Sequence, residues 1–187
     1  GRACYESVGA SCLDKLCHRR RIMKALSSFK YALEGIWHTI KTERHMRIHI
    51  VVAVYVLFFA QFFELSAVSY ALLYAVTAAV PAAELINTAA ERICNAVTKK
   101  ENPLIKAAKD AAAGAVLVCA AGAVAVGICL FWKPEKIWEI IFNIASTPEL
   151  ITIFILSLII SVLFIVMGPT EMGKNAASYI SRDKDDK

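Results

Sequence analysis

Several motifs of soluble nucleotide-binding and hydrolytic enzymes are absent from this 187-residue sequence. It has no GxxxxGK[ST] phosphate loop and no GxGxxG turn after a strand, which argues against the common soluble nucleotide-binding folds. No serine lies in a GxSxG setting, which argues against a serine hydrolase. The six cysteines form no CxxC pair, so we expect free thiols rather than a disulfide framework.

Charge is scarce and unevenly placed. Only 20% of the residues are charged, whereas 58% are hydrophobic. Runs without any Asp, Glu, Lys or Arg cover residues 50–63, 65–83, 111–132 and 150–170. A soluble domain would instead spread its apolar residues at the period of a helix or strand. The runs predict an all-α integral membrane protein.

The placement of the cationic residues predicts the orientation of the chain. All but two of the 21 lysines and arginines lie before residue 50, between 91 and 110, or after 170, the exceptions being Lys133 and Lys136. By the positive-inside rule, both termini and the 91–110 loop are expected on the cytoplasmic side of a bacterial cell membrane. The net charge of +5 follows the membrane borders without a basic stripe of interleaved aromatics. It therefore indicates lipid head groups, and not nucleic acid, as partners.

The pattern divides the chain into segments. Apolar positions from Leu26 to Ile40 have the spacing of an amphipathic helix, which suits the membrane interface. The uncharged run at 150–170 has the character of an appended anchor, and a mixed-charge tail follows it. The expected order is a flexible extension (1–23), an interfacial helix (about 24–44), three spans (about 48–63, 65–90 and 110–132), an outer turn with an extra transmembrane helix (133–170), and a disordered cytoplasmic tail (171–187).

A polar stripe marks the end of the second predicted span. At about 100° per residue, its five members fall on one helical face. They are Glu84, Asn87, Thr88, Glu91 and Asn95. Carboxylates beside an apolar span are costly, so such a stripe is a functional-site hypothesis. Glu43, Lys109 and Asp110 are expected at the same membrane border.

These residue types favour chemistry on a phosphate. Carboxylates that converge at one border repel one another unless a cation neutralises them, and Mg²⁺ with phosphate oxygens is the natural occupant. Glu84 lies about two helical turns deeper than Glu91, which suits a general base acting on a lipid group. Two alternatives remain from the residues alone. The stripe is either this site or a buried polar network that fixes helix packing; an ion-conducting bundle is disfavoured because the polar groups cluster at one border.

Two segments resemble a known family. Glu84-Leu-Ile-Asn-Thr-Ala-Ala-Glu91, followed by Ala107-Ala-Lys-Asp-Ala-Ala-Ala-Gly-Ala-Val116, is similar to the signature of the small bacterial integral-membrane lipid kinases. These are the prokaryotic diacylglycerol kinases and undecaprenol kinases. Ser28 to Trp37 and Thr42 to His49 resemble their amphipathic helix and first span. The resemblance covers about residues 24–132 and implies a homotrimer of three-span subunits with composite active sites at the cytoplasmic border.

The resemblance also implies roles for individual residues. Glu84 corresponds to the general base for the lipid hydroxyl, Glu43 and Glu91 to the ligands that hold Mg²⁺ with ATP, and Asn87 to a supporting residue. The matching positions near the nucleotide are Lys24, Tyr31, Glu43, Glu91, Asn95, Lys100, Glu101, Asn102, Lys109 and Asp110.

Two positions depart from the family pattern. Asn95 stands where the family usually has Asp, and Lys24 stands where a basic residue, often Arg, is usual; Lys keeps the charge without the bidentate fork. We expect an ATP-dependent lipid kinase with Mg²⁺ as cofactor and undecaprenol as acceptor. The alternatives are a diacylglycerol kinase and a catalytically silent membrane scaffold, the latter motivated by Asn95 and the extra helix.

Overall fold

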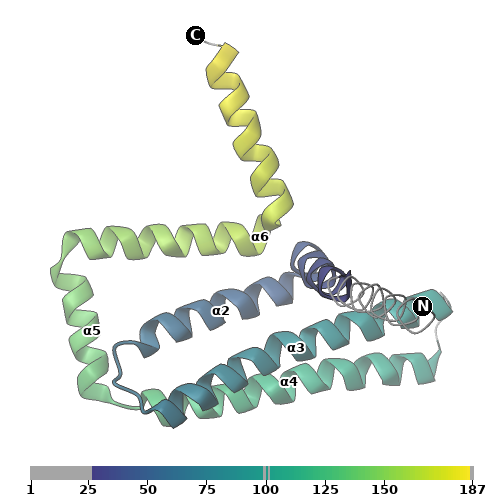
Figure 1. The fold of residues 1–187 in the computed structure, drawn as a ribbon, viewed down its shortest axis with the longest axis horizontal. Helices are drawn as coiled ribbons and strands as arrows, with labels where there is room; N and C mark the ends of the chain where they lie inside the picture. Colours follow the sequence, from purple (N-terminus) through teal and green to yellow (C-terminus); the bar gives the residue numbers. More distant parts are fainter. Residues whose placement is uncertain (1–26, 99, 101, 186–187) are drawn as a thin grey trace, which may run out of the picture. The chain divides into compact units, whose positions relative to one another are not determined.

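The computed structural model describes residues 27–98, 100 and 102–185, and side chains as far as residue 169. All regular structure in these residues is helical, as the sequence predicts (Figure 1). Residues 27–42 form a first helix. The helices after it are α2 (Arg44–Ala60), α3 (Ala67–Val97), α4 (Pro103–Phe131), α5 (Pro134–Ser146) and α6 (Pro148–Asp185). The extension predicted at 1–23, together with Lys24 and Glu101, lies outside the described residues.

The chain divides into two units, one ending at His38 and the other running from Thr39 to Lys187. In the first unit, the large apolar side chains of Phe29, Tyr31 and Leu33 are all well exposed. Lys30 and Glu34, one turn apart, approach to 3.8 Å. A helix with exposed aromatics and paired charges suits a membrane interface. That location stays a prediction.

Three helices are long and apolar enough to cross a membrane: Ala67–Val97, Pro103–Phe131 and Pro148–Pro169. They correspond to the second, third and fourth predicted spans. The first predicted span, 48–63, corresponds to α2, whose 17 residues extend only about 25 Å. That length is less than the ~30 Å of a hydrocarbon core. Its crossing of the membrane therefore remains a prediction.

Helices α3 and α4 lie side by side as an antiparallel pair (Figure 1). The loop between them is much shorter than the predicted 91–110 segment, because α3 continues to Val97 and α4 already begins at Pro103. No glycine or proline interrupts residues 84–97, so the helix continues beyond the uncharged run. Asn102 then caps α4 by accepting a 2.9 Å hydrogen bond from the Leu104 amide.

The predicted outer turn at 133–149 contains a helix, α5. Pro134 lies in its first turn, with Glu135 beside it. Ile137, Ile140, Ile141 and Ile144 recur at helical spacing. These are ordinary signals of an amphipathic helix, so the sequence could have predicted it.

The extra helix α6 packs on α2, and its role as a membrane anchor stays a prediction. The hydroxyl of Tyr55 on α2 lies 3.0 Å from the Ser157 hydroxyl and 3.1 Å from that of Ser161. Gly168 breaks α6 with a φ of 71°. Beyond Pro169 the chain is again helical as far as Asp185, where the sequence predicts a disordered tail. After Pro169 this segment contains no further proline, which permits helix.

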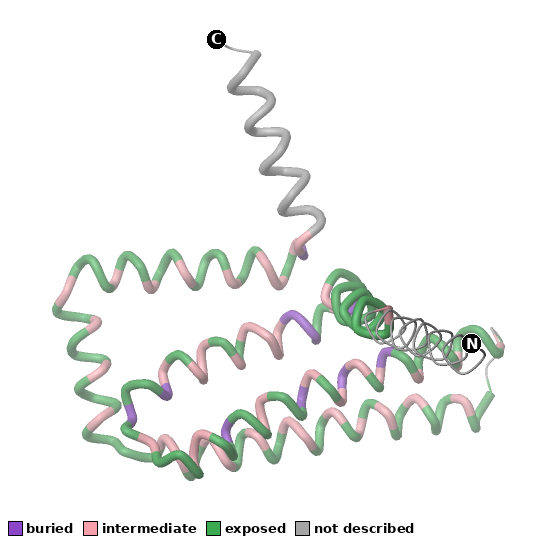
Figure 2. The backbone as a smooth tube through the Cα atoms, viewed as in Figure 1, coloured by how far each residue is buried: buried purple, intermediate pink, exposed green. Residues whose placement is uncertain are grey.

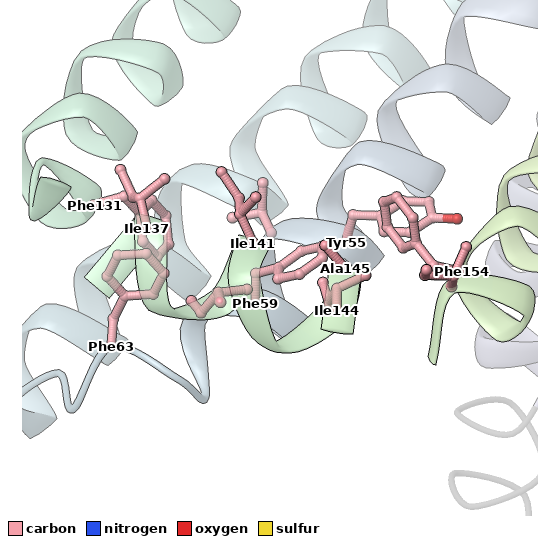
Figure 3. Close-up of a pocket in the computed structure, with 12 residues that line it drawn as sticks. Tyr55, Phe59, Phe63, Phe131, Ile137, Ile141, Ile144, Ala145 and Phe154 are labelled. Atoms are coloured by element: carbon pink, nitrogen blue, oxygen red, sulfur yellow. The ribbon is translucent and has the colours of Figure 1, made fainter. Parts of the chain in front are cut away.

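Few of the described side chains are buried (Figure 2). None of the α4 side chains is buried, and large apolar side chains are exposed on every helix with described side chains. An apolar cavity of about 610 Å³ lies among α2, α4, α5 and α6, as Figure 3 shows. Phe59, Phe63 and Phe131 contribute to its lining, which holds no Asp, Glu, Lys, Arg or His. The cavity therefore offers no group for phosphate chemistry.

Candidate active site

The polar stripe predicted from the sequence lies entirely on α3. Burial decreases along it toward the end of the helix. Glu84 and Thr88 are each only 4% exposed, Asn87 is intermediate, and Glu91 and Asn95 are exposed. The stripe thus has an enclosed carboxylate at one end and a solvent-exposed carboxylate at the other. The two groups suit different tasks. The enclosed group can accept a proton from a substrate, and the open one can bind a solvated ion.

Glu84 is positioned by the approach of α2 to α3. His49 of α2 lies close enough to interact electrostatically with Glu84. Pro81, one turn earlier in α3, lacks the amide hydrogen that would bond to the Thr77 carbonyl. His49 forms no salt bridge with the carboxylate, and the described residues hold no ion pair at Glu84. Within the described part of the chain, this carboxylate is thus enclosed without a salt bridge to a Lys or Arg side chain.

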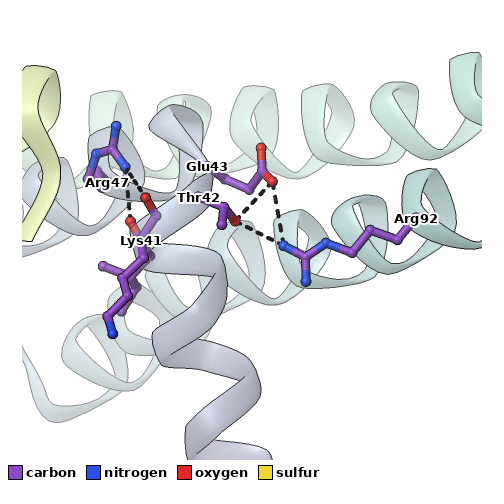
Figure 4. A network of polar contacts seen from close by, with 6 residues as sticks. Lys41, Thr42, Glu43, Arg47 and Arg92 are labelled. Carbon is purple, nitrogen blue, oxygen red and sulfur yellow. Dashed lines mark hydrogen bonds and ion pairs between the residues drawn. The ribbon is translucent and has the colours of Figure 1, made fainter. Parts of the chain in front are cut away.

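Glu43 occupies the break between the first helix and α2. Its backbone is extended (φ −102°, ψ 119°), and its amide donates a 2.8 Å hydrogen bond to the Thr39 carbonyl. Its side chain does not cap α2. The carboxylate instead accepts a 3.1 Å hydrogen bond from the Thr42 hydroxyl and lies 3.7 Å from Arg92 of α3 (Figure 4). Glu43 is therefore directed toward the polar end of α3.

Lys109 of α4 reaches the far end of the stripe. Its amine donates a 2.6 Å hydrogen bond to the side-chain oxygen of Asn95. The Asn that departs from the family pattern thus serves as an acceptor for a residue predicted to contact nucleotide. Asp110, the next residue on α4, is exposed.

Lys100 and Asn102, which are also predicted near the nucleotide, contact residues close to them in sequence. The Lys100 amide bonds to the Thr98 hydroxyl at 3.0 Å, and the Asn102 oxygen is engaged in capping α4. Tyr31 belongs to the unit that ends at His38. Lys24 and Glu101 fall outside the described residues. For these positions a nucleotide role stays a prediction.

Two arginines that the sequence reasoning did not single out are part of this region. Arg92 contacts both Thr42, at 2.9 Å, and Glu43. Arg47 is buried and donates hydrogen bonds to the backbone carbonyls of Ile40, Lys41 and Ile165. Arg92 directly follows Glu91, and Arg47 lies one helical turn after Glu43. Both arginines lie close in sequence to a predicted site residue, but only the fold shows which residues they contact.

Glu43 and Glu91 match the donor set that Mg²⁺ uses with phosphates, because the ion takes one or two carboxylates and completes its shell with substrate oxygens and water. The Glu43 side chain is also not used as a helix cap. Yet no group of three or more His, Cys, Asp or Glu side chains is close enough to hold a metal by itself among the described residues. The described carboxylates of one chain therefore do not form a complete protein cage for a metal.

Comparison with known proteins is consistent with this geometry. The family model described as prokaryotic diacylglycerol kinase matches residues 30–131. An undecaprenol kinase from Bacillus subtilis (strain 168) is 38% identical over 119 residues, which are 64% of this chain and 97% of that protein. A diacylglycerol kinase from Synechocystis sp. is 41% identical over 110 residues, which are 58% of this chain and 63% of that protein. No solved structure matches the chain significantly.

The family match contains α2, α3 and α4 with every predicted site residue from Tyr31 to Asp110, whereas α5 and α6 follow it. The match covers more than half of the chain. The helical structure, the membrane-length helices and this match agree with one another. The chain therefore belongs to the prokaryotic diacylglycerol kinase family and is a phosphotransferase with an alcohol group as acceptor.

Proposed function

We propose that this protein transfers the γ-phosphate of ATP to the hydroxyl of undecaprenol at the cytoplasmic border of the membrane. The observation that carries this proposal is the graded stripe on α3, with Glu84 buried and Glu91 exposed on the same helical face. The lipid hydroxyl can approach Glu84 from the apolar layer, while the polar nucleotide stays near the solvent-exposed end. This arrangement suits transfer between a water-soluble donor and a membrane-bound acceptor.

In this mechanism Glu84 accepts the proton of the lipid hydroxyl as the hydroxyl oxygen attacks the γ-phosphorus of ATP, while the bond from that phosphorus to the β,γ-bridging oxygen breaks and ADP leaves. Glu43 and Glu91 would hold Mg²⁺, and the ion would supply positive charge that neutralises the phosphates. Lys109, held by Asn95, contributes a further positive charge near the phosphates. Phosphoryl transfer depends mainly on positioning and electrostatic stabilisation, so few protein groups are needed.

The choice of undecaprenol rests on the extent of similarity. The relative named undecaprenol kinase is matched over 97% of its length, and the one named diacylglycerol kinase over 63%. The identities, 38% and 41%, do not separate the two. Diacylglycerol is therefore the second candidate acceptor.

We further propose a homotrimer with active sites shared between subunits. In one chain the described carboxylates form no metal-binding group, and the α4 side chains are all at least partly exposed. Apolar helix faces with small residues favour close helix packing in a membrane. A neighbouring copy would cover such faces and add groups to each site.

Purified protein in lipid nanodiscs, with labelled ATP and either undecaprenol or diacylglycerol, tests the proposal. We expect Mg²⁺-dependent labelling of undecaprenol. Labelling of diacylglycerol alone would show that diacylglycerol, and not undecaprenol, is the acceptor. Labelling of neither lipid would favour the catalytically silent scaffold.

A further inference from the structure

Arg47 connects the extra helix α6 with the segment that carries Glu43. The arginine is only 7% exposed. One of its terminal nitrogens donates hydrogen bonds of 3.1 Å to the carbonyls of both Ile40 and Lys41. Its Nε donates a 3.0 Å hydrogen bond to the carbonyl of Ile165 on α6. Figure 4 shows the first part of this network beside the Glu43–Arg92 contact.

Each of these carbonyls lies where a helix ends. Ile40 and Lys41 belong to the last turn of the helix that stops at residue 42. The helical partner of the Ile165 carbonyl would be the amide of residue 169, but Pro169 has no amide hydrogen. Arg47 supplies a hydrogen-bond donor to all three carbonyls and so connects the end of one helix with the kink of another.

Glu43 lies directly after the carbonyls that Arg47 binds. Its extended backbone depends on the helix stopping at residue 42. Its amide donates a hydrogen bond to the Thr39 carbonyl in the last turn of that helix. The direction of its carboxylate toward Arg92 follows from this break. A change at Arg47 or at the kink in α6 would therefore alter the placement of Glu43.

We propose that Arg47 is a positioning residue through which α6 fixes the orientation of Glu43 in the active site. The inference rests on the proposed role of Glu43 as a ligand of Mg²⁺. It assigns α6 a part in metal binding, although α6 lies outside the region that the family shares. Arg47 itself need not touch substrate, nucleotide or metal.

Gly168 provides a way to disturb the link from the α6 side. Its φ of 71° disfavours any residue with a Cβ, and a Cβ there would lie 3.2 Å from an Arg47 terminal nitrogen. Gly127 on α4 is a matched control, because a Cβ at that position has no neighbouring atom within 4 Å. Arg44, an exposed arginine at the start of α2, is the matched control for charge.

The test uses the full chain in nanodiscs and compares Arg47→Gln, Arg47→Lys and Gly168→Ala with Arg44→Gln and Gly127→Ala. We expect Arg47→Gln and Gly168→Ala to raise the half-activating Mg²⁺ concentration by about tenfold, while kcat at saturating Mg²⁺ changes less than about twofold. The half-activating Mg²⁺ concentration of Arg47→Lys should lie between that of the wild type and that of these two variants, because an ammonium group keeps the charge but lacks the planar fork of the guanidinium. In a Glu43→Asp background, the Mg²⁺ effect of Arg47→Gln should disappear.

Hydrogen exchange gives a readout that does not require activity. Exchange of the Glu43 amide should become faster in Arg47→Gln and in Gly168→Ala, and stay unchanged in both controls. Unchanged Mg²⁺ activation and unchanged exchange in Gly168→Ala would overturn the proposal, as would equal effects in Gly127→Ala. If wild-type protein phosphorylates no lipid, the proposed function fails, and the exchange data still decide whether Arg47 holds Glu43.

Discussion

Lys109 on α4 donates a 2.6 Å hydrogen bond to the side-chain oxygen of Asn95 on α3. This bond joins the exposed end of the polar stripe to the Lys-Asp pair at the start of the next helix. It places a cation beside the stripe although Lys109 is 14 residues away in sequence. Asn95 thus keeps the acceptor that an aspartate would provide, without the negative charge.

Restoring the charge at this position should strengthen metal binding. In Asn95→Asp the bond to Lys109 becomes charge-assisted, and the added carboxylate attracts Mg²⁺. We expect active enzyme whose half-activating Mg²⁺ concentration is lower by about two- to fivefold, the range for a partly exposed charge. Titration of the kinase rate with Mg²⁺ measures this. Asn95→Leu is the matched comparison and should raise the KM for ATP; an unchanged KM in that variant would contradict a nucleotide role.

Arg92 should compete with Mg²⁺ for Glu43. The guanidinium lies 3.7 Å from the carboxylate, and both side chains are partly exposed. Exposed pairs of this kind contribute about 0.2–1 kcal/mol. Arg92→Gln should therefore lower the half-activating Mg²⁺ concentration by about 1.5- to 5-fold. Arg44→Gln, which removes the same charge nearby, should leave it unchanged; a higher requirement for Mg²⁺ in Arg92→Gln would show that Arg92 assists binding instead.

Subunit mixing tests whether sites are shared. Glu43→Gln and Glu84→Gln should each be inactive as pure assemblies. If the base and the metal ligand come from neighbouring subunits, a one-to-one mixed assembly regains about a quarter of the sites, by random combination in a closed ring. Activity after co-expression and co-purification of the two variants measures this. An inactive mixture would assign both residues to the same subunit.

Much of this fold could be predicted from local patterns, and the failures have physical causes. Uncharged runs predicted α3, α4 and the apolar part of α6, because membrane length and composition are local properties. The helical stripe predicted the shared face of Glu84 and Glu91. The 91–110 segment was predicted as a loop from its charges, but much of it is helical, because α3 continues to Val97 and α4 begins at Pro103.

The contacts of α6 could not be predicted in this way. Ser157 follows its partner Tyr55 by 102 positions in the sequence, and Ile165 follows Arg47 by 118. Ser157 and Ser161 have helical spacing, but that spacing does not indicate which helix carries their partner. The position of Pro169, four residues after Ile165, does predict an unpaired carbonyl, but not which donor satisfies it.

The central claim is that the stripe on α3 is a phosphotransfer site in which Glu84 takes the proton of the lipid hydroxyl. Its most direct test is the single-turnover rate of Glu84→Gln with saturating ATP, Mg²⁺ and undecaprenol. Gln keeps the size and removes the base, so we expect the rate to fall by about 10²–10⁴-fold while ATP affinity and the oligomeric state stay as in wild type. A rate within a few-fold of wild type would contradict the account.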